Sequence, residues 1–151
     1  MGSSDFKEFF ALLHAKKVEF LVIGGVAYNH YAPPRATKDI DVWIRPSVDN
    51  CANFIAALAE FGFPTADLSA IDLAGDDRVL ILGRAPNRID VLTLPGGCDW
   101  ETAWPRRTMS DYDEVPLPVI GLEDLIVMKA HAGRPQDLVD VIKLRKVLQA
   151  G

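Results

Sequence analysis

The feature that most constrains the fold is a short apolar segment that carries two aspartates. In KDIDVWIRP the side chains alternate as in a β-strand, so Ile40 and Val42 share one face while Asp39 and Asp41 share the other. Aspartate fits poorly on a pleated, half-buried surface. A strand with two aspartates on one face therefore predicts that this face borders a functional site.

A second apolar segment repeats the same alternation. In RIDVLT, Ile89 and Val91 lie on one face and Asp90 on the other. If the two strands are neighbours with their apolar faces on the helices, Asp90 lies beside Asp39 and Asp41. Three close carboxylates raise one another's pKa unless a cation compensates. Mg²⁺ prefers oxygen ligands and completes its shell with waters and substrate phosphates, so these three residues predict a magnesium site.

A glycine pair precedes the first of these strands. Gly24 and Gly25 end the apolar segment VEFLVIGG, which predicts a buried strand, and they precede VAYNHYA, which predicts a short helix that ends before Pro33. Glycine lets the backbone approach a ligand, and the N–H groups that open a helix favour an anion. A triphosphate would fit between these donors and a carboxylate-bound metal. Glycine pairs alone are common in tight turns, so the combination with the paired aspartates carries the prediction.

The rest of the chain alternates between helical and strand patterns. The mixed order predicts one domain over residues 1–151 of the α/β or α+β class, with a mixed central sheet, helices packed on it and two C-terminal helices. The remaining predicted elements are helices at SSDFKEFFALLHAKK and SVDNCANFIAALAEFG, strands at RVLILG and NRIDVLTL joined through Ala85, Pro86 and Asn87, a short helix or turn in GGCDWETAWPRR, one or two edge strands at TMSDYDEVPLPVIG, and the last two helices on either side of Gly133.

Composition narrows the class of protein further. The formal net charge of −5 argues against a protein whose whole surface grips a phosphate backbone, although a local basic rim stays compatible with it. No apolar run approaches the roughly 18 residues of a membrane span, and the first ten residues lack a signal-peptide pattern. The two cysteines, Cys51 and Cys98, form no CxxC motif. We therefore expect a cytoplasmic protein without disulfides or membrane contact.

The motifs resemble a known superfamily. The string FLVIGGVAYNHYAPPRATKDIDVWI, followed by RIDVLT, is similar to the nucleotidyltransferase fold of the DNA polymerase β superfamily. The nearest kin would be small bacterial members, which include minimal nucleotidyltransferases and toxin components of toxin–antitoxin systems. The C-terminal LEDLIVMKAHAGRPQDLVDVIKL also resembles these proteins, and the similarity extends from Leu21 to Leu144. Two positions depart from the pattern: Gly25 replaces a serine of better-known polymerases, and Gln136 stands where close relatives carry a basic residue.

The resemblance implies roles for individual residues. Asp39 and Asp41 would bind Mg²⁺, of which two ions are expected. Asp90 would bind the second ion and act as, or orient, the base for the acceptor hydroxyl. Gly24 and Gly25 would contact nucleotide phosphate.

Three basic residues are further candidates for nucleotide binding. Lys129 would contact the triphosphate by the same resemblance, or else it is a lysine that extends its ammonium group to solvent. Arg35 and Lys38 precede the aspartate strand and either contact phosphate or only solvate the loop.

Other polar and aromatic residues have structural interpretations. Asp137 and Asp140 suit the positive end of a helix dipole, with a salt bridge to Arg134. Trp43 shares the face of the aspartates, so it either stacks on a base or packs as an edge aromatic. The three histidines show no metal-ligand spacing, so we expect them to be ordinary, partly exposed residues.

The expected activity is transfer of a nucleoside monophosphate from a nucleoside triphosphate to a hydroxyl acceptor. The acceptor is a small molecule, a protein, or an RNA end reached through Arg35, Arg106 and Arg107. The alternative is a catalytically silent module that binds a nucleotide or a partner, including a toxin–antitoxin component. All three carboxylates are present, which favours an enzyme. An open sheet edge would also allow a homodimer.

Overall fold

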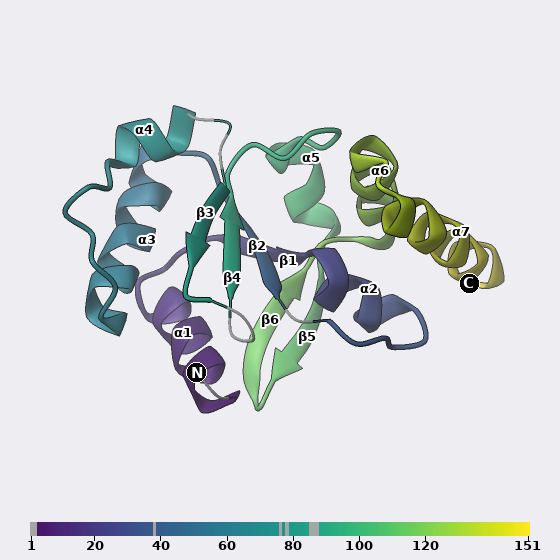
Figure 1. Ribbon diagram of the computed structural model, residues 1–151, viewed down its shortest axis with the longest axis horizontal. Coiled ribbons are helices and arrows are strands. Elements are labelled where there is room, and N and C mark those ends of the chain that lie inside the picture. Colours follow the sequence, from purple (N-terminus) through teal and green to yellow (C-terminus); the bar gives the residue numbers. More distant parts are fainter. Residues whose placement is uncertain (1–2, 38, 76, 78, 85–87) are drawn as a thin grey trace.

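Figure 1 shows the computed structural model, which describes residues 3–37, 39–75, 77, 79–84 and 88–151. Helices and strands alternate along the chain in the mixed order that the sequence predicts. The elements are α1 (Ser3–Ala15), β1 (Phe20–Ile23), α2 (Gly24–Tyr31), β2 (Ile40–Ile44), α3 (Val48–Phe61), α4 (Ala70–Gly75), β3 (Val79–Leu82), β4 (Ile89–Leu92), α5 (Trp100–Ala103), the 3₁₀ helix η1 (Trp104–Arg106), β5 (Thr108–Tyr112), β6 (Val115–Val119), α6 (Leu122–Ala132) and α7 (Pro135–Ala150).

The strands form one six-stranded sheet in the order β3–β4–β2–β1–β6–β5. β2 pairs with β4 and β1 pairs with β6 in parallel, whereas the other neighbouring strands are antiparallel. The predicted α/β fold with a mixed sheet and two C-terminal helices is therefore confirmed. The adjacency of β2 and β4, on which the predicted carboxylate site depends, is also present.

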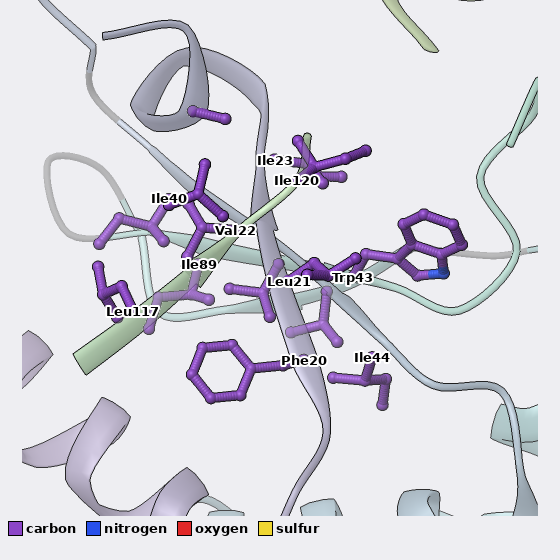
Figure 2. Packing of buried hydrophobic residues seen from close by; sticks show 14 of the residues in the cluster. Phe20, Leu21, Val22, Ile23, Ile40, Trp43, Ile44, Ile89, Leu117 and Ile120 are labelled. Atoms are coloured by element: carbon purple, nitrogen blue, oxygen red, sulfur yellow. The ribbon is translucent and has the colours of Figure 1, made fainter. Parts of the chain in front are cut away.

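The core is built around β1. All its residues, Phe20–Ile23, are buried, as a continuous apolar run predicts for a central strand. Figure 2 shows how they pack with side chains from β2, β4 and β6, including Ile40, Ile89 and Leu117. Because a slip of one residue would move every apolar side chain out of this core, the core fixes the register of β2. The position of the aspartates on its other face is fixed with it.

The helices gather in two groups in Figure 1. α1 packs on α3 and α3 on α4 toward one side of the sheet, while α6 and α7 lie side by side at the opposite end of the molecule and contact α2. The boundaries of α3 agree with the sequence: Ser47 accepts a hydrogen bond from the Asn50 N–H, and Gly62 ends the helix with φ of 110°. No helix in the described residues has both the length and the apolar character needed to cross a bilayer.

The β5–β6 hairpin differs from the prediction of edge strands in one respect. β5 is an edge strand, but β6 lies inside the sheet between β1 and β5 despite Pro116 and Pro118. Along one edge β6 is paired with β1 only at Val22 and Val119, so the missing N–H groups of the prolines interrupt no long ladder there. Along its other edge β6 pairs with β5 over its whole length, with Pro116 opposite Asp111 and Pro118 opposite Met109. The Pro116 carbonyl accepts instead from His14 Nε2 at 2.6 Å.

The β3–β4 hairpin is confirmed as an antiparallel pair. Its predicted connection through Ala85, Pro86 and Asn87 lies outside the described residues. The segment between α3 and β3 has no clear pattern in the sequence, and the structure places the short helix α4 there.

Candidate active site

Three aspartates meet where β2 and β4 run in parallel. Asp41 lies directly opposite Asp90 in the register of the two strands. Asp39 precedes Asp41 by two residues, so it projects from the same face. A single guanidinium, that of Arg88, lies 2.7 Å from Asp90 and 3.9 Å from Asp39. The three aspartates therefore lie on one face of two neighbouring strands, as the alternation in the sequence predicts.

Asp41 carries the strongest electrostatic sign of this crowding. The pKa of its carboxyl is raised to about 6, first by burial and then by the nearby charges of Asp90 and Asp39. The positive charges of Lys129 and Arg134 act in the opposite direction. Burial and the two neighbouring carboxylates thus outweigh the effect of these cations on Asp41.

The first glycine of the pair is held against this carboxylate. Ile23 is opposite Asp41 in the antiparallel register of β1 and β2, so α2 begins directly beside it. Gly24 has φ of 67°, and a Cβ at this position would lie 2.8 Å from Asp41 Cγ. A Cβ on Gly25 would lie 2.6 Å from Thr37 Oγ1. Both positions therefore require glycine for close packing, and the first also requires it for its backbone conformation.

The N-terminus of α2 has free donor capacity. Its N-cap residue, Ile23, makes no side-chain capping hydrogen bond. The first N–H groups of a helix have no intrahelical acceptor, and they carry the positive end of the helix dipole. The start of α2 at Gly24 therefore offers an anion donors beside the Asp41 carboxylate.

Arg35 is held firmly in the loop between α2 and β2. Its backbone exchanges two hydrogen bonds with the Asn29 side chain, at 2.8 and 3.0 Å. Its guanidinium carbon lies 5.0 Å above the Tyr28 ring, and its Nη2 donates to Asp140 Oδ2 at 2.7 Å. Arg35 is thus an ordered cation, which disfavours the interpretation as a loop-solvating residue. Lys38, the other predicted phosphate contact in this loop, lies outside the described residues.

Lys129 is buried and does not extend to solvent. Only 6% of the residue is exposed, and its Nζ donates to Asp140 at 2.9 Å and lies 3.5 Å from Asp137. The alternative of a solvent-seeking lysine is therefore wrong. A buried ammonium held by carboxylates is a fixed positive charge.

Asp140 is the acceptor that connects these cations. It is fully buried and accepts from Arg35, Lys129 and Gln136. Burial alone would raise the pKa of this carboxyl, but these hydrogen bonds hold it below its ordinary value. The role of Asp140 goes beyond the helix-dipole role predicted from the sequence.

Asp137 does have the predicted salt bridge. Arg134 Nε donates to its Oδ2 at 2.7 Å, and the two residues form a capping box at the start of α7. Gln136, where a basic residue is the usual pattern, donates to the buried Asp140 at 2.9 Å.

A cavity of about 190 Å³ joins the two halves of the site. Gly24 lines it from the start of α2 and Asp41 from β2, and Lys129, His131 and Arg134 line it from the C-terminal helix pair. Its other lining residues are mostly apolar: Ile23, Leu92, Pro95, Gly96, Leu125, Met128, Ala132 and the acidic Asp137. The cavity therefore has charged groups at both sides and an apolar lining between them.

His131 is the site residue that sequence reasoning missed. The sequence assigned it no role, yet it lines the cavity. A Cβ on Gly96 would collide with its imidazole, and one on Gly97 would lie 2.9 Å from its Cβ. The glycines of PLPGGC, which drew no attention in the sequence, are the signal of this close approach.

Trp43 and the two exposed arginines have other partners. Trp43 is 1% exposed, donates from Nε1 to the Thr93 carbonyl at 3.1 Å and packs edge-on against Trp100. It leaves no face for a nucleotide base, so the edge-aromatic interpretation is correct. Arg106 lies 3.4 Å from Asp124, and Arg107 stacks over Trp104. Neither arginine is among the residues that line the cavity.

The residues present fit magnesium in chemistry. Carboxylate oxygens are ligands that Mg²⁺ prefers, and Asp41 lies opposite Asp90 with Asp39 two residues before it. The cluster is not arranged as a finished site, however, since no group of three or more His, Cys, Asp or Glu side chains in the described residues could hold a metal ion as it stands. Instead, the Arg88 guanidinium donates hydrogen bonds to both carboxylate oxygens of Asp90.

Comparison with known proteins gives the fold. No protein-family model and no curated protein matches the sequence. Several solved structures do match. LnuA, a lincosamide antibiotic adenylyltransferase with lincomycin bound, has a TM-score of 0.56 at 14% identity, over 97% of this chain and 98% of its own. The antibiotic-resistance factor ANT(2'')-Ia has a TM-score of 0.58 at 12% identity, over 98% of this chain and 83% of its own.

A third similar structure is TM1012 from Thermotoga maritima, a presumed nucleotidyltransferase, with a TM-score of 0.56 at 16% identity over 97% of this chain and 91% of its own. The chain therefore has the nucleotidyltransferase fold, as the resemblance implied. Within that class, the similar structures are an antibiotic adenylyltransferase, a resistance factor and the Thermotoga protein. The toxin–antitoxin type stays a prediction.

Proposed function

We propose that the protein is a Mg²⁺-dependent nucleotidyltransferase, which moves a nucleoside monophosphate from a nucleoside triphosphate to a hydroxyl acceptor. The observation that carries this proposal is the register that places Asp41 opposite Asp90 and beside the start of α2 at Gly24. Carboxylates next to a helix N-terminus suit a metal-bound triphosphate, because one side offers oxygen ligands and the other offers N–H donors.

Asp39, Asp41 and Asp90 would hold the metal, for which two ions are expected. Bound metal ions would lower the pKa of an acceptor hydroxyl and stabilise the pyrophosphate leaving group. The clustering of three negative charges on one face of the sheet supports this assignment, since each needs a cation nearby.

The other groups bind and orient the substrates. The backbone N–H groups at Gly24 and Gly25 contact phosphate at the start of α2. Lys129 places a fixed positive charge at the far side of the cavity. Asp90 accepts the proton of the acceptor hydroxyl or orients the group that does so. Catalysis of this kind rests on positioning and charge neutralisation.

A small molecule is the acceptor class that the cavity favours. The cavity is about 190 Å³ and has a largely apolar lining, and the similar structure LnuA has lincomycin bound. The net charge of −5 disfavours a long nucleic acid held along the surface. A single RNA end and a protein hydroxyl are the alternatives that the experiment separates.

The test is label transfer from each of the four α-³²P nucleoside triphosphates with Mg²⁺ in a cell extract. Wild type is compared with Asp41→Asn, and products are separated into RNA, protein and small molecules. We expect label with wild type alone, and the labelled fraction identifies the acceptor. Label that persists with Asp41→Asn would contradict the site assignment. No label with any nucleotide would favour a silent nucleotide- or partner-binding module.

A further inference from the structure

Arg88 makes an unusual contact for a residue beside a metal-binding cluster. It precedes Asp90 by two residues, so both side chains project from the same face of the strand. Its Nε donates to Asp90 Oδ1 at 2.7 Å, and its Nη2 donates to Oδ2 at 2.9 Å. Both oxygens of Asp90 are therefore engaged by one planar guanidinium, which is the strongest geometry for such a pair.

The same guanidinium also serves a second carboxylate. Its Nε lies 3.9 Å from Asp39 Oδ2. One positive charge thus lies against two of the three carboxylates that would bind metal. An arginine side chain stays protonated in proteins, so this positive charge is permanent.

A metal ion and this guanidinium require the same lone pairs. Metal ligation at Asp90 needs at least one carboxylate oxygen that Arg88 now engages, and two cations in one place repel each other.

We propose that Arg88 is an internal counterion that occupies the place of a metal between Asp90 and Asp39 and must be displaced before the metal binds. The inference rests on the proposed function and adds a residue that controls metal entry. A triphosphate provides an alternative acceptor for a released guanidinium, because arginine pairs with phosphate oxygens as well as with carboxylates. Metal alone would therefore bind weakly, and metal with nucleotide more tightly.

The test measures Mn²⁺ binding without nucleotide, from the electron paramagnetic resonance signal of the free ion. Arg88→Gln removes the charge, whereas Arg88→Lys keeps the charge and loses the bidentate geometry. Arg84→Gln is the matched control, because Arg84 is an exposed arginine of the same hairpin. Asp41→Asn is the control for the metal site. The melting temperature of each variant reports whether it is folded.

We expect Arg88→Gln to bind Mn²⁺ about threefold to tenfold more tightly than wild type, in keeping with the modest strength of a part-exposed ion pair. Arg88→Lys should lie between the two, Arg84→Gln should stay within about twofold of wild type, and Asp41→Asn should lose binding.

Two results would overturn the proposal while the metal site stands. One is Arg88→Gln binding no more tightly than wild type while Asp41→Asn abolishes binding. The other is an equal gain in Arg84→Gln, which would assign the effect to net charge. If no variant binds Mn²⁺ and wild type transfers no label, the proposed function fails together with the inference.

Discussion

Asp41 shows at the scale of a single residue how function and stability oppose each other. Its carboxylate lies opposite Asp90 and two residues from Asp39, and the Gly24 backbone closes over it. A neutral side chain of the same shape would relieve the repulsion among three like charges. The residue is retained at a site where it costs folding free energy, and sites of this kind are commonly functional.

Asp41→Asn should therefore separate activity from stability. We expect nucleotidyl transfer to fall by at least about 100-fold, because one metal ligand is lost. The free energy of unfolding in EDTA should stay equal or rise by about 0.5–2 kcal/mol, because a like charge is removed. Urea denaturation monitored by circular dichroism measures this. Asp67→Asn, at an exposed loop position, should change neither quantity, and a large loss of stability in Asp41→Asn would contradict the reasoning.

Gly24→Ala tests the close approach between the start of α2 and Asp41 on β2. An alanine there would adopt φ of 67° and place its Cβ against the Asp41 carboxylate. We expect a loss of about 2–4 kcal/mol in unfolding free energy together with loss of transfer. Gly62→Ala is the matched control, because Gly62 also has positive φ but its Cβ would meet nothing within 4 Å. It should lose only about 1 kcal/mol and keep its activity. Equal stabilities of the two variants would show that the collision with Asp41 is relieved at little cost.

At the scale of elements, α6 and α7 are joined to the α2–β2 loop by a buried charge cluster. Asp140 on α7 accepts from Lys129 on α6 and from Arg35 in the loop. Lys129 was predicted to bind phosphate from the resemblance, and Arg35 from its place in the loop. Both share the carboxylate of Asp140. This cluster fixes where the helix pair stands relative to the carboxylates on the sheet.

Asp140→Ala should destabilise the protein strongly, because it leaves the buried Lys129 without its shortest ion pair. We expect a loss of about 3–5 kcal/mol in unfolding free energy, measured by urea denaturation. Glu60→Ala, which removes the surface pair with Lys16 (2.8 Å), should change stability by less than about 1 kcal/mol. A small effect for Asp140→Ala would mean that the cluster contributes little to the attachment of the helices.

The same cluster predicts a pH dependence. The pKa of Asp140 is below its ordinary value in the folded protein, despite burial, because Arg35, Lys129 and Gln136 donate to it. The stability that this carboxylate contributes is present above its unfolded pKa of about 4 and is lost as the pH falls toward the folded pKa. The difference in unfolding free energy between wild type and Asp140→Asn should therefore be constant from pH 7 to 5 and shrink below about pH 4. A difference that grows below about pH 4 would contradict this prediction, because it would mean that folding raises the pKa of Asp140.

The elements also show what the sequence can predict. Asp39, Asp41 and Asp90 could be predicted because alternation along a strand fixes the face on which each side chain lies. In both segments the aspartates lie on the face opposite the apolar residues, so they share a face once the two strands are neighbours. The inner position of β6 could not be predicted from the sequence. A proline indicates a missing N–H donor, but it does not indicate which of the two neighbouring strands loses a hydrogen bond.

Contacts between segments that are distant in the sequence could not be predicted from local patterns either. Asp140 looks like any carboxylate near a helix start, and its three partners come from separate positions in the chain. His131 has no local pattern, since its neighbours Gly96 and Gly97 come from another loop. Trp43 alternates correctly with the aspartates, yet its large ring is covered by Trp100.

At the scale of the whole molecule, the candidate site lies between parts that are far apart in the sequence. The start of α2 provides Gly24, β2 provides Asp41, and the C-terminal helix pair provides Lys129 and His131. α1 and α3 lie at the opposite end of the molecule from that helix pair in Figure 1, and none of their residues is among those that line the cavity. A nucleotide in the cavity would contact α2 and α6 simultaneously.

Hydrogen exchange with and without ligand tests this arrangement. With Mg²⁺ and a nucleoside triphosphate analogue that has a methylene bridge between its α- and β-phosphates, we expect slower exchange in α2 and α6 together. The amides of α1 and α3 should change only as far as global stabilisation requires. Asp41→Asn with the same ligand is the control and should lose the effect. Protection in α2 without α6 would move the nucleotide out of the cavity and remove Lys129 from the site.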